Sequence, residues 1–443
     1  MQIHYYIALC SLATLTLWGN ITLLKQRADA FAAQEKFEEA IALYTECYAT
    51  NPYDVNTLFS AALCLLKIGK TSEAITLFES LVPQVSNATS VKYNIAYAYK
   101  TAGMLDKAIP LYEALIAERP DYEDAHLALG FAYIQKGDFA RGWPQHSRYL
   151  KRAGKNGDAL RALLAHDAVA GKKVVLHYEG GLGDTILFIR YAQKLKNLGA
   201  EIICLVQKPL IPLLSRCAYI DRLLPYKTPF PEYDAVATLM SLPAIFGDTE
   251  EKFPVSIPYI QPDSTLVTEW HERLKNYDGI KIGITWQSDV HNDVSRLPIA
   301  RRGIPLTLFE PLLKDPRYTF ISLQCFEGTE QIAQLSPDCR LITYENFDTE
   351  YGAFMDTAAL IPNLDLIIAV DSAVANIAGA LGAHTLLLLP YATDWRWIAG
   401  RTDSPWYPYH RILKQPQPFD WATVVTELTQ YLESYYPQKK DLS

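Results

Sequence analysis

A period of 34 residues governs the first third of the chain. In the first three periods a small residue precedes an aromatic one by four positions, and in the second to fourth a glycine lies five positions before the small residue. The positions are Ala40, Ala74, Ala108 and Gly142; Tyr44, Phe78 and Tyr112; and Gly69, Gly103 and Gly137. Glycine ends a helix, and the small residue lets the next helix pack closely against it. The pattern predicts about four helix hairpins within residues 21–156.

This pattern resembles the tetratricopeptide repeat, whose period is 34 residues. The last unit departs from it, with Gly142 at the alanine position and His146 at the aromatic position. Motif residues of such repeats build the solenoid, whereas the concave groove binds a peptide or protein. The repeats therefore predict a protein or glycan partner without naming it.

Beyond residue 172 the hydrophobic pattern becomes that of an α/β protein. The run KVVLHY predicts a strand, EGGLGD a turn, TILFIRYAQKLKNLGA a helix, and EIICLV a second strand. Gly181 and Gly183 in the turn allow a ligand to approach the backbone, and the helix start near Asp184 can accept an anion. Ile186 stands where a dinucleotide fingerprint needs glycine, and no GK[ST] follows the turn. Dinucleotide and Walker-type sites are thus disfavoured.

A second α/β half begins near Ile280. Its strands are predicted at IKIGITW, YTFISLQ, DLIIAV and HTLLLLP, and Asp371 and Ser372 end the third of them and open a small-residue helix. The predicted division is an apolar segment at 1–20, repeats at 21–156, one Rossmann-like half at 157–262, a hinge at 263–278 and a second half at 279–435. The expected fold is multidomain, an all-α repeat solenoid followed by an α/β domain.

The α/β segments resemble a known family when taken in order. EGGLGDTILFIRY, GITWQS, RRGIPL, DLIIAVDSAVANIAGALG and DWRWIAGRTDSPWYP are similar to blocks of bacterial proteins that join tetratricopeptide repeats to a domain related to glycosyltransferase family 9. That family includes the lipopolysaccharide heptosyltransferases. The resemblance spans about 172–435 together with the repeats. It implies a GT-B architecture and transfer of a sugar from a nucleotide-sugar to a hydroxyl, with inversion.

The resemblance also implies roles for single residues. Asp184 would be the catalytic base, and the backbone of Gly181 and Gly183 would admit phosphate. The second half would hold the donor, and a basic residue would neutralise its diphosphate. Asp371, Ser372 and Asn376 would bind the nucleotide-sugar donor, and Arg301 or Arg302 would neutralise its diphosphate. Two positions depart from the family, which usually has Gln at Gly180 and His at Asn376.

Each of these residues also has a purely structural interpretation. Asp184 and the Asp371–Ser372 pair are at helix starts, where such residues cap the helix. Trp395 and Trp397 suit packing between domains better than stacking on a base. Arg301 and Arg302 could be surface charges.

Composition narrows the remaining choices. The 443 residues carry 41 basic and 49 acidic side chains, a net charge of −8, which argues against nucleic acid as the main partner. The 7 cysteines include no CxxC pair, so neither a disulfide framework nor a metal site is expected, and a reducing compartment is favoured. The uncharged stretch 5–24 suits a cap helix, a membrane anchor or a signal peptide. Lys25 and Arg27 follow it, so an anchor would leave the rest of the chain cytoplasmic.

Three hypotheses of function follow. The first is a cytoplasmic glycosyltransferase, membrane-associated if residues 5–24 act as an anchor, that needs no cofactor besides its nucleotide-sugar substrate. The second is a non-catalytic repeat scaffold with a degenerate glycosyltransferase-like domain. The third is a nucleotide-binding regulator without transfer.

Overall fold

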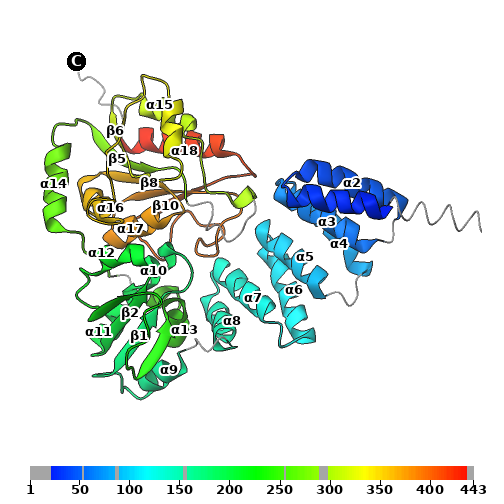
Figure 1. Cartoon of the computed structure of the whole chain (residues 1–443), viewed down its shortest axis with the longest axis horizontal. Coiled ribbons are helices and arrows are strands. Elements are labelled where there is room, and N and C mark those ends of the chain that lie inside the picture. Colours follow the sequence, from blue (N-terminus) through cyan, green and yellow to red (C-terminus); the bar gives the residue numbers. More distant parts are fainter. Residues whose placement is uncertain are drawn as a thin grey trace, which may run out of the picture. The chain divides into compact units, whose positions relative to one another are not determined.

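The computed structural model describes residues 21–51, 54–84, 89–152, 157–253, 256–288 and 298–436. The chain forms two compact units (Figure 1). One comprises Met1–Ala125 with Ser295–Ala300, and the other comprises His126–Val294 with Arg301–Ser443. The predicted apolar stretch 5–24 is described only from residue 21 onward. Among the described residues, no helix has the length and apolarity needed to cross a membrane.

The repeat region is built from antiparallel helix pairs. After a helical segment at 21–33 come α2 (Phe37–Thr50), α3 (Val55–Lys67), α4 (Thr71–Leu81), α5 (Thr89–Thr101), α6 (Leu105–Glu118), α7 (Glu123–Gln135) and α8 (Phe139–Arg152). Gly69, Gly103 and Gly137 lie between paired helices with φ of 82°, 75° and 85°, which side-chain-bearing residues rarely adopt. Ala40, Ala74 and Ala108 are fully buried, as the periodic pattern predicts.

The fourth hairpin departs from the pattern for a reason visible in its packing. A Cβ on Gly142 would lie 2.5 Å from Ile134 Cγ1 and 2.9 Å from the carbonyl oxygen of Gly130, so α7 and α8 approach too closely for alanine. His146 is buried at the aromatic position, 5.5 Å from the Phe131 ring. Burial lowers its pKa to about 4, so it packs there as a neutral ring.

The first α/β half contains a four-stranded parallel sheet of order β3-β2-β1-β4. Its strands are β1 (Lys173–His177), β2 (Glu201–Val206), β3 (Arg222–Pro225) and β4 (Ala235–Thr238). Its helices are α9 (Asp158–Ala165), α10 (Leu182–Phe188), α11 (Arg190–Asn197), α12 (Ile211–Leu214) and α13 (Leu242–Phe246). The single helix expected after the glycine turn is thus two helices that meet at Ile189. Helix α9 lies in a stretch that had no predicted structure and packs on β4.

The second half contains a six-stranded parallel sheet of order β10-β9-β8-β5-β6-β7. Its strands are β5 (Ile280–Thr285), β6 (Tyr318–Ser322), β7 (Leu341–Ile342), β8 (Leu366–Val370), β9 (Thr385–Leu389) and β10 (His410–Lys414). Its helices are α14 (Ser264–Leu274), α15 (Glu310–Leu313), α16 (Met355–Leu360), α17 (Ala373–Leu381) and α18 (Trp421–Tyr435). Helix α14 fills most of 263–278, the expected hinge, and packs on α16.

Short 3-10 helices connect these elements. They are η1 (Val82–Gln84), η2 (Lys208–Leu210), η3 (Leu239–Ser241), η4 (Glu250–Lys252), η5 (Pro298–Ala300), η6 (Leu306–Phe309), η7 (Thr329–Gln334) and η8 (Ile361–Asn363). The fold is therefore a helical repeat region followed by an α/β region with two parallel sheets.

The second sheet is buried on both faces, as all-parallel sheets usually are. Alternate residues of β8 enter different cores: Ile368 packs toward α15 and α18, and Ile367 joins the core that contains α17. This second core also contains Trp143 of α8 and Leu176 of β1. The last hairpin and both α/β halves therefore share one hydrophobic core.

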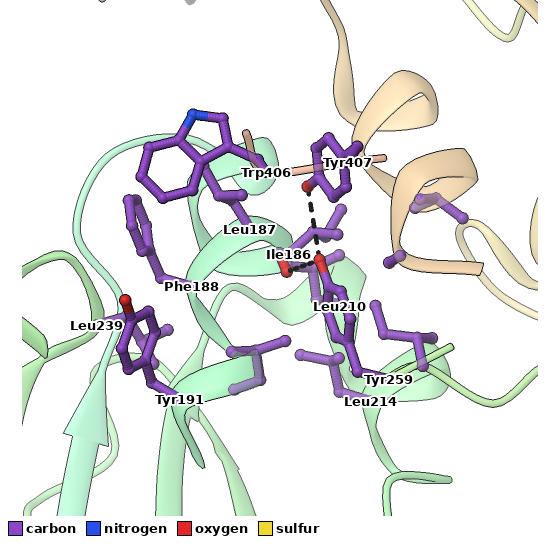
Figure 2. Close-up of a cluster of buried hydrophobic side chains, with 14 of the residues drawn as sticks. Ile186, Leu187, Phe188, Tyr191, Leu210, Leu214, Leu239, Tyr259, Trp406 and Tyr407 are labelled. Carbon is purple, nitrogen blue, oxygen red and sulfur yellow. Dashed lines mark hydrogen bonds between the residues drawn. The ribbon is translucent and has the colours of Figure 1, made fainter. Parts of the chain in front are cut away.

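A buried cation joins the halves within that core. Arg190 donates from Nη1 to the Trp406 carbonyl oxygen at 2.9 Å, from Nη2 to the Tyr259 hydroxyl at 2.9 Å, and from Nε to the Leu187 carbonyl oxygen at 2.8 Å. Figure 2 shows Tyr259 among the buried hydrophobic side chains of this core. Its hydroxyl donates to the Ile186 carbonyl oxygen at 3.0 Å and lies 3.5 Å from the Tyr407 hydroxyl.

Candidate functional site

The glycine turn after β1 is closed by its own carboxylate. Asp184 Oδ2 accepts the Gly181 backbone N–H at 2.7 Å, which caps α10. Gln207, at the end of β2, donates to the Gly181 carbonyl oxygen at 3.1 Å and accepts the Thr185 hydroxyl at 2.9 Å. The capping interpretation of Asp184 is therefore correct in geometry, and the turn is held from two sides.

The other carboxylate oxygen of Asp184 pairs with an arginine from the second half. Asp184 Oδ1 meets Arg396 Nη2, and the same guanidinium contacts Asp394 through Nη1. Both side chains of the Asp184–Arg396 pair are largely buried, with 7% and 14% exposed. Burial lowers the pKa of Arg396 to about 10, so the group stays cationic at neutral pH.

Asp371 and Ser372 follow β8 and start α17. Ser372 Oγ accepts the Ala375 N–H at 3.4 Å and caps the helix. Arg302 Nη1 lies 3.2 Å from both the carbonyl oxygen and a carboxylate oxygen of Asp371. The structure thus brings together two residues that were predicted to bind the nucleotide-sugar. Arg301 is exposed.

Asn376 and Gly183 join the two halves. Asn376 is buried; its Nδ2 donates to the Ser372 carbonyl oxygen and its Oδ1 accepts the Tyr407 hydroxyl, both at 2.9 Å. A Cβ on Gly183 would lie 2.8 Å from Asn376 Nδ2. Gly183 thus gives α10 the close approach to α17 that the two helices make.

Three residues of the site, Arg396, Asp394 and Gln207, were not among the predicted ones. The arginine stands between Trp395 and Trp397, the two tryptophans that are expected to pack between domains and not to stack on a base. Both tryptophans are buried; Trp395 stacks on Phe131 and Trp397 on His410. The cation between two buried tryptophans was a usable signal, because a buried charge needs a partner. Within the described part of the chain, no three His, Cys, Asp or Glu side chains could hold a metal ion together.

Gly180 lies in the glycine turn at a point where a side chain has no room. Its φ is 81°, and a Cβ there would overlap the Asp184 carboxylate. We expect Gly180→Ala to destabilise the protein by about 2–3 kcal/mol, from backbone strain plus displacement of Asp184. Gly171→Ala is the control: its φ is 73° with open space around it, so it should cost only about 1 kcal/mol. Denaturant unfolding measures both, and equal losses would contradict the clash.

Comparisons with known proteins bear first on the repeats. The tetratricopeptide repeat model matches residues 31–93 and 101–166. Protein FlbA of Caulobacter vibrioides is 27% identical over 285 residues, which is 60% of this chain and 47% of FlbA. This chain therefore spans less than half of FlbA, and the name states no activity.

Solved structures of MamA are also similar. One from Desulfovibrio magneticus RS-1 is 19% identical with a TM-score of 0.29, over 30% of this chain and 76% of that one. MamA AMB-1 is 18% identical with a TM-score of 0.28, over 30% and 73%. Neither likeness extends to most of the chain. What is established is that the N-terminal part contains tetratricopeptide repeats.

Proposed function

We propose that this protein is a GT-B-type glycosyltransferase, which moves a sugar from a nucleotide-sugar to an acceptor hydroxyl while its repeats recruit a protein or glycan partner. One observation carries the proposal: α10, which follows the glycine turn of the first sheet, packs on α17, which follows β8 of the second. Ligands of parallel α/β sheets bind at the carboxyl ends of the strands. Two such ends, each with a carboxylate and an arginine, adjoin here.

The donor would bind on the second half. The start of α17 at Ser372 offers backbone N–H groups, and Arg302 offers a cation beside them. Arg301, Asp371 and Asn376 would complete the set, with the Gly181 and Gly183 backbone on the opposite side. No metal or further cofactor is needed, because cationic side chains can neutralise the diphosphate.

Asp184 would deprotonate the acceptor hydroxyl. The oxygen then forms a bond to the anomeric carbon from the face opposite the leaving group, the bond from that carbon to the phosphate oxygen breaks, and the nucleoside diphosphate leaves with the electron pair. Asp184 accepts the Gly181 N–H through one oxygen and pairs with Arg396 through the other, so the proton would go to a remaining lone pair of the carboxylate.

The test is a screen for transfer and hydrolysis of UDP-, GDP- and ADP-sugars. We expect Asp184→Asn to lower kcat roughly 10²–10⁴-fold, because the amide cannot act as a base. Asp158→Asn is the control, since Asp158 forms an exposed pair with Arg161. Thermal shift with the same nucleotide-sugar checks that the variant still binds donor. Equal turnover in Asp184→Asn would remove Asp184 from the base role.

A non-catalytic scaffold is the second candidate, and the site itself gives a reason for it. The Asn376 amide is hydrogen-bonded internally, and Asp184 is committed to a cap and an ion pair. A protein that gives no thermal shift with any nucleotide-sugar favours the scaffold, and a shift without turnover favours a nucleotide-binding regulator. We place all three functions in the cytoplasm; the described cysteines are unpaired thiols, which suits a reducing compartment.

A further inference from the structure

The segment that carries Arg396 is held at both ends by one residue of the last repeat hairpin. Gln135 ends α7, and its side-chain Nε2 lies 3.4 Å from the Thr393 carbonyl oxygen and 3.3 Å from Thr393 Oγ1. Its backbone carbonyl accepts the Ala399 N–H at 2.8 Å. We call residues 393–399 the arginine segment; its two ends are tied to one helix terminus.

Aromatic packing fixes the middle of the arginine segment. Phe131, one turn before Gln135 on α7, stacks on Trp395 with ring centroids 4.9 Å apart and planes 9° apart. Trp395 is also stacked with Phe188, the last residue of α10, at 6.3 Å. The Arg396 guanidinium lies 4.7 Å from the centre of the Trp395 ring. Repeat helix, arginine segment and glycine-turn helix thus form one stack.

Arg396 itself is restrained beyond its ion pairs. Its backbone N–H donates to Asp394 Oδ1 at 3.1 Å, and its carbonyl accepts Trp406 Nε1 at 2.8 Å. Both bonds hold the backbone from which the Arg396 guanidinium reaches Asp184. Asp184 in turn holds the Gly181 N–H, so the contacts run from Gln135 to the glycine turn without interruption.

We propose that Gln135 and Phe131 are positioning residues that hold Arg396 on Asp184, which makes the last repeat hairpin part of the site. This deepens the proposed function and rests on it, since Asp184 is the base there. A neighbouring guanidinium favours the ionised carboxylate, the form a general base needs. The hairpin therefore acts on the base only through the position of Arg396.

The first test needs no substrate. Hydrogen exchange measured by mass spectrometry compares Gln135→Ala with Gln145→Ala, a control in the same hairpin whose side chain bonds to His126 instead. We expect Gln135→Ala to speed exchange severalfold in peptides covering 393–399 and also 178–184, because Gly181 N–H depends on Asp184. Gln145→Ala should change neither. Faster exchange at 393–399 alone, or at neither peptide, would overturn the proposal.

Phe131→Leu serves as a second variant, because it keeps the Gln135 bonds and loses the stack on Trp395. Hydrogen exchange should again become faster in the peptides covering 393–399 and 178–184.

The second test is the pH profile of kcat/KM. Its acid limb should move to higher pH in Arg396→Gln, less in Gln135→Ala, and partly return in Arg396→Lys; an unmoved limb in all variants would overturn the role. Absence of turnover in the wild-type protein would refute the proposed function alone, because the exchange result still decides the positioning.

Discussion

Replacing Arg190 with alanine should destabilise the α/β unit by about 3–5 kcal/mol. The side chain is 2% exposed and donates to three acceptors, the carbonyl oxygens of Leu187 and Trp406 and the hydroxyl of Tyr259. Its guanidinium also lies 4.4 Å from the Tyr259 ring centre. Truncation removes these bonds and leaves a cavity where the halves meet, so the two costs add.

Arg216→Ala is the matched control for Arg190→Ala. That guanidinium is 42% exposed and pairs with Asp263 at the surface, so its loss should cost at most about 1 kcal/mol. Thermal unfolding should show a midpoint lowered by roughly 6–10 °C for Arg190→Ala. Arg190→Lys should fall between the two, because an ammonium cannot reach all three acceptors. If the unfolding midpoint of Arg190→Ala is no lower than that of Arg216→Ala, the hydrogen bonds of Arg190 do not stabilise the contact between the halves.

Asp348→Asn should change how stability depends on pH. Asp348 is buried, accepts the Thr357 N–H at 2.9 Å, and lies near the Asp356 carboxylate. Burial raises its pKa to about 6, although the Thr357 hydrogen bonds act in the opposite direction. The folded protein therefore holds this proton more tightly than the unfolded chain does. The stabilisation is complete below about pH 4 and is lost as the pH rises through about 6.

Asparagine lacks this titration and tolerates the φ of 55° at this position. The free energy of unfolding of Asp348→Asn, relative to wild type, should therefore rise by up to about 3 kcal/mol between pH 4 and pH 7. Asp315→Asn is the control with the opposite sign, because Arg317 lowers the pKa of Asp315. Denaturant unfolding at several pH values measures both variants. A pH-independent difference for Asp348→Asn would contradict a raised pKa.

Sequence periodicity predicted the repeats and the two parallel sheets because those patterns are local. The small residue Ala74 and the apolar run of β8 are buried, and their neighbours in the sequence are enough to predict this. Helix α14 was missed although its signals are equally local. Asp263 caps it, and Leu266, Trp270 and Leu274 recur at four-residue spacing on its buried face. That spacing, together with the cap at Asp263, predicts the helix that occupies most of the expected hinge.

The site was predictable only as two separate strand ends. Asp184 and Asp371 follow strands, and that position alone marked them as candidates. Their partners follow no local rule: Arg396 lies 212 positions from Asp184 and Arg302 lies 69 from Asp371. The roles of these residues in donor binding and base catalysis stay predictions.

The hydrogen bond between Gln135 and Thr393 joins residues that are 258 positions apart. During synthesis, the last repeat hairpin therefore leaves the ribosome long before its partner segment does. At ordinary ribosomal speeds of 5–20 residues per second, roughly 13–50 s separate the emergence of these partners. Through that interval the aromatic side chains of the last hairpin, among them Phe131 and Trp143, lack the Trp395 ring they pack on. Nascent chains halted before residue 393 would thus expose apolar side chains on the last hairpin of an otherwise complete solenoid, a surface that chaperones can bind.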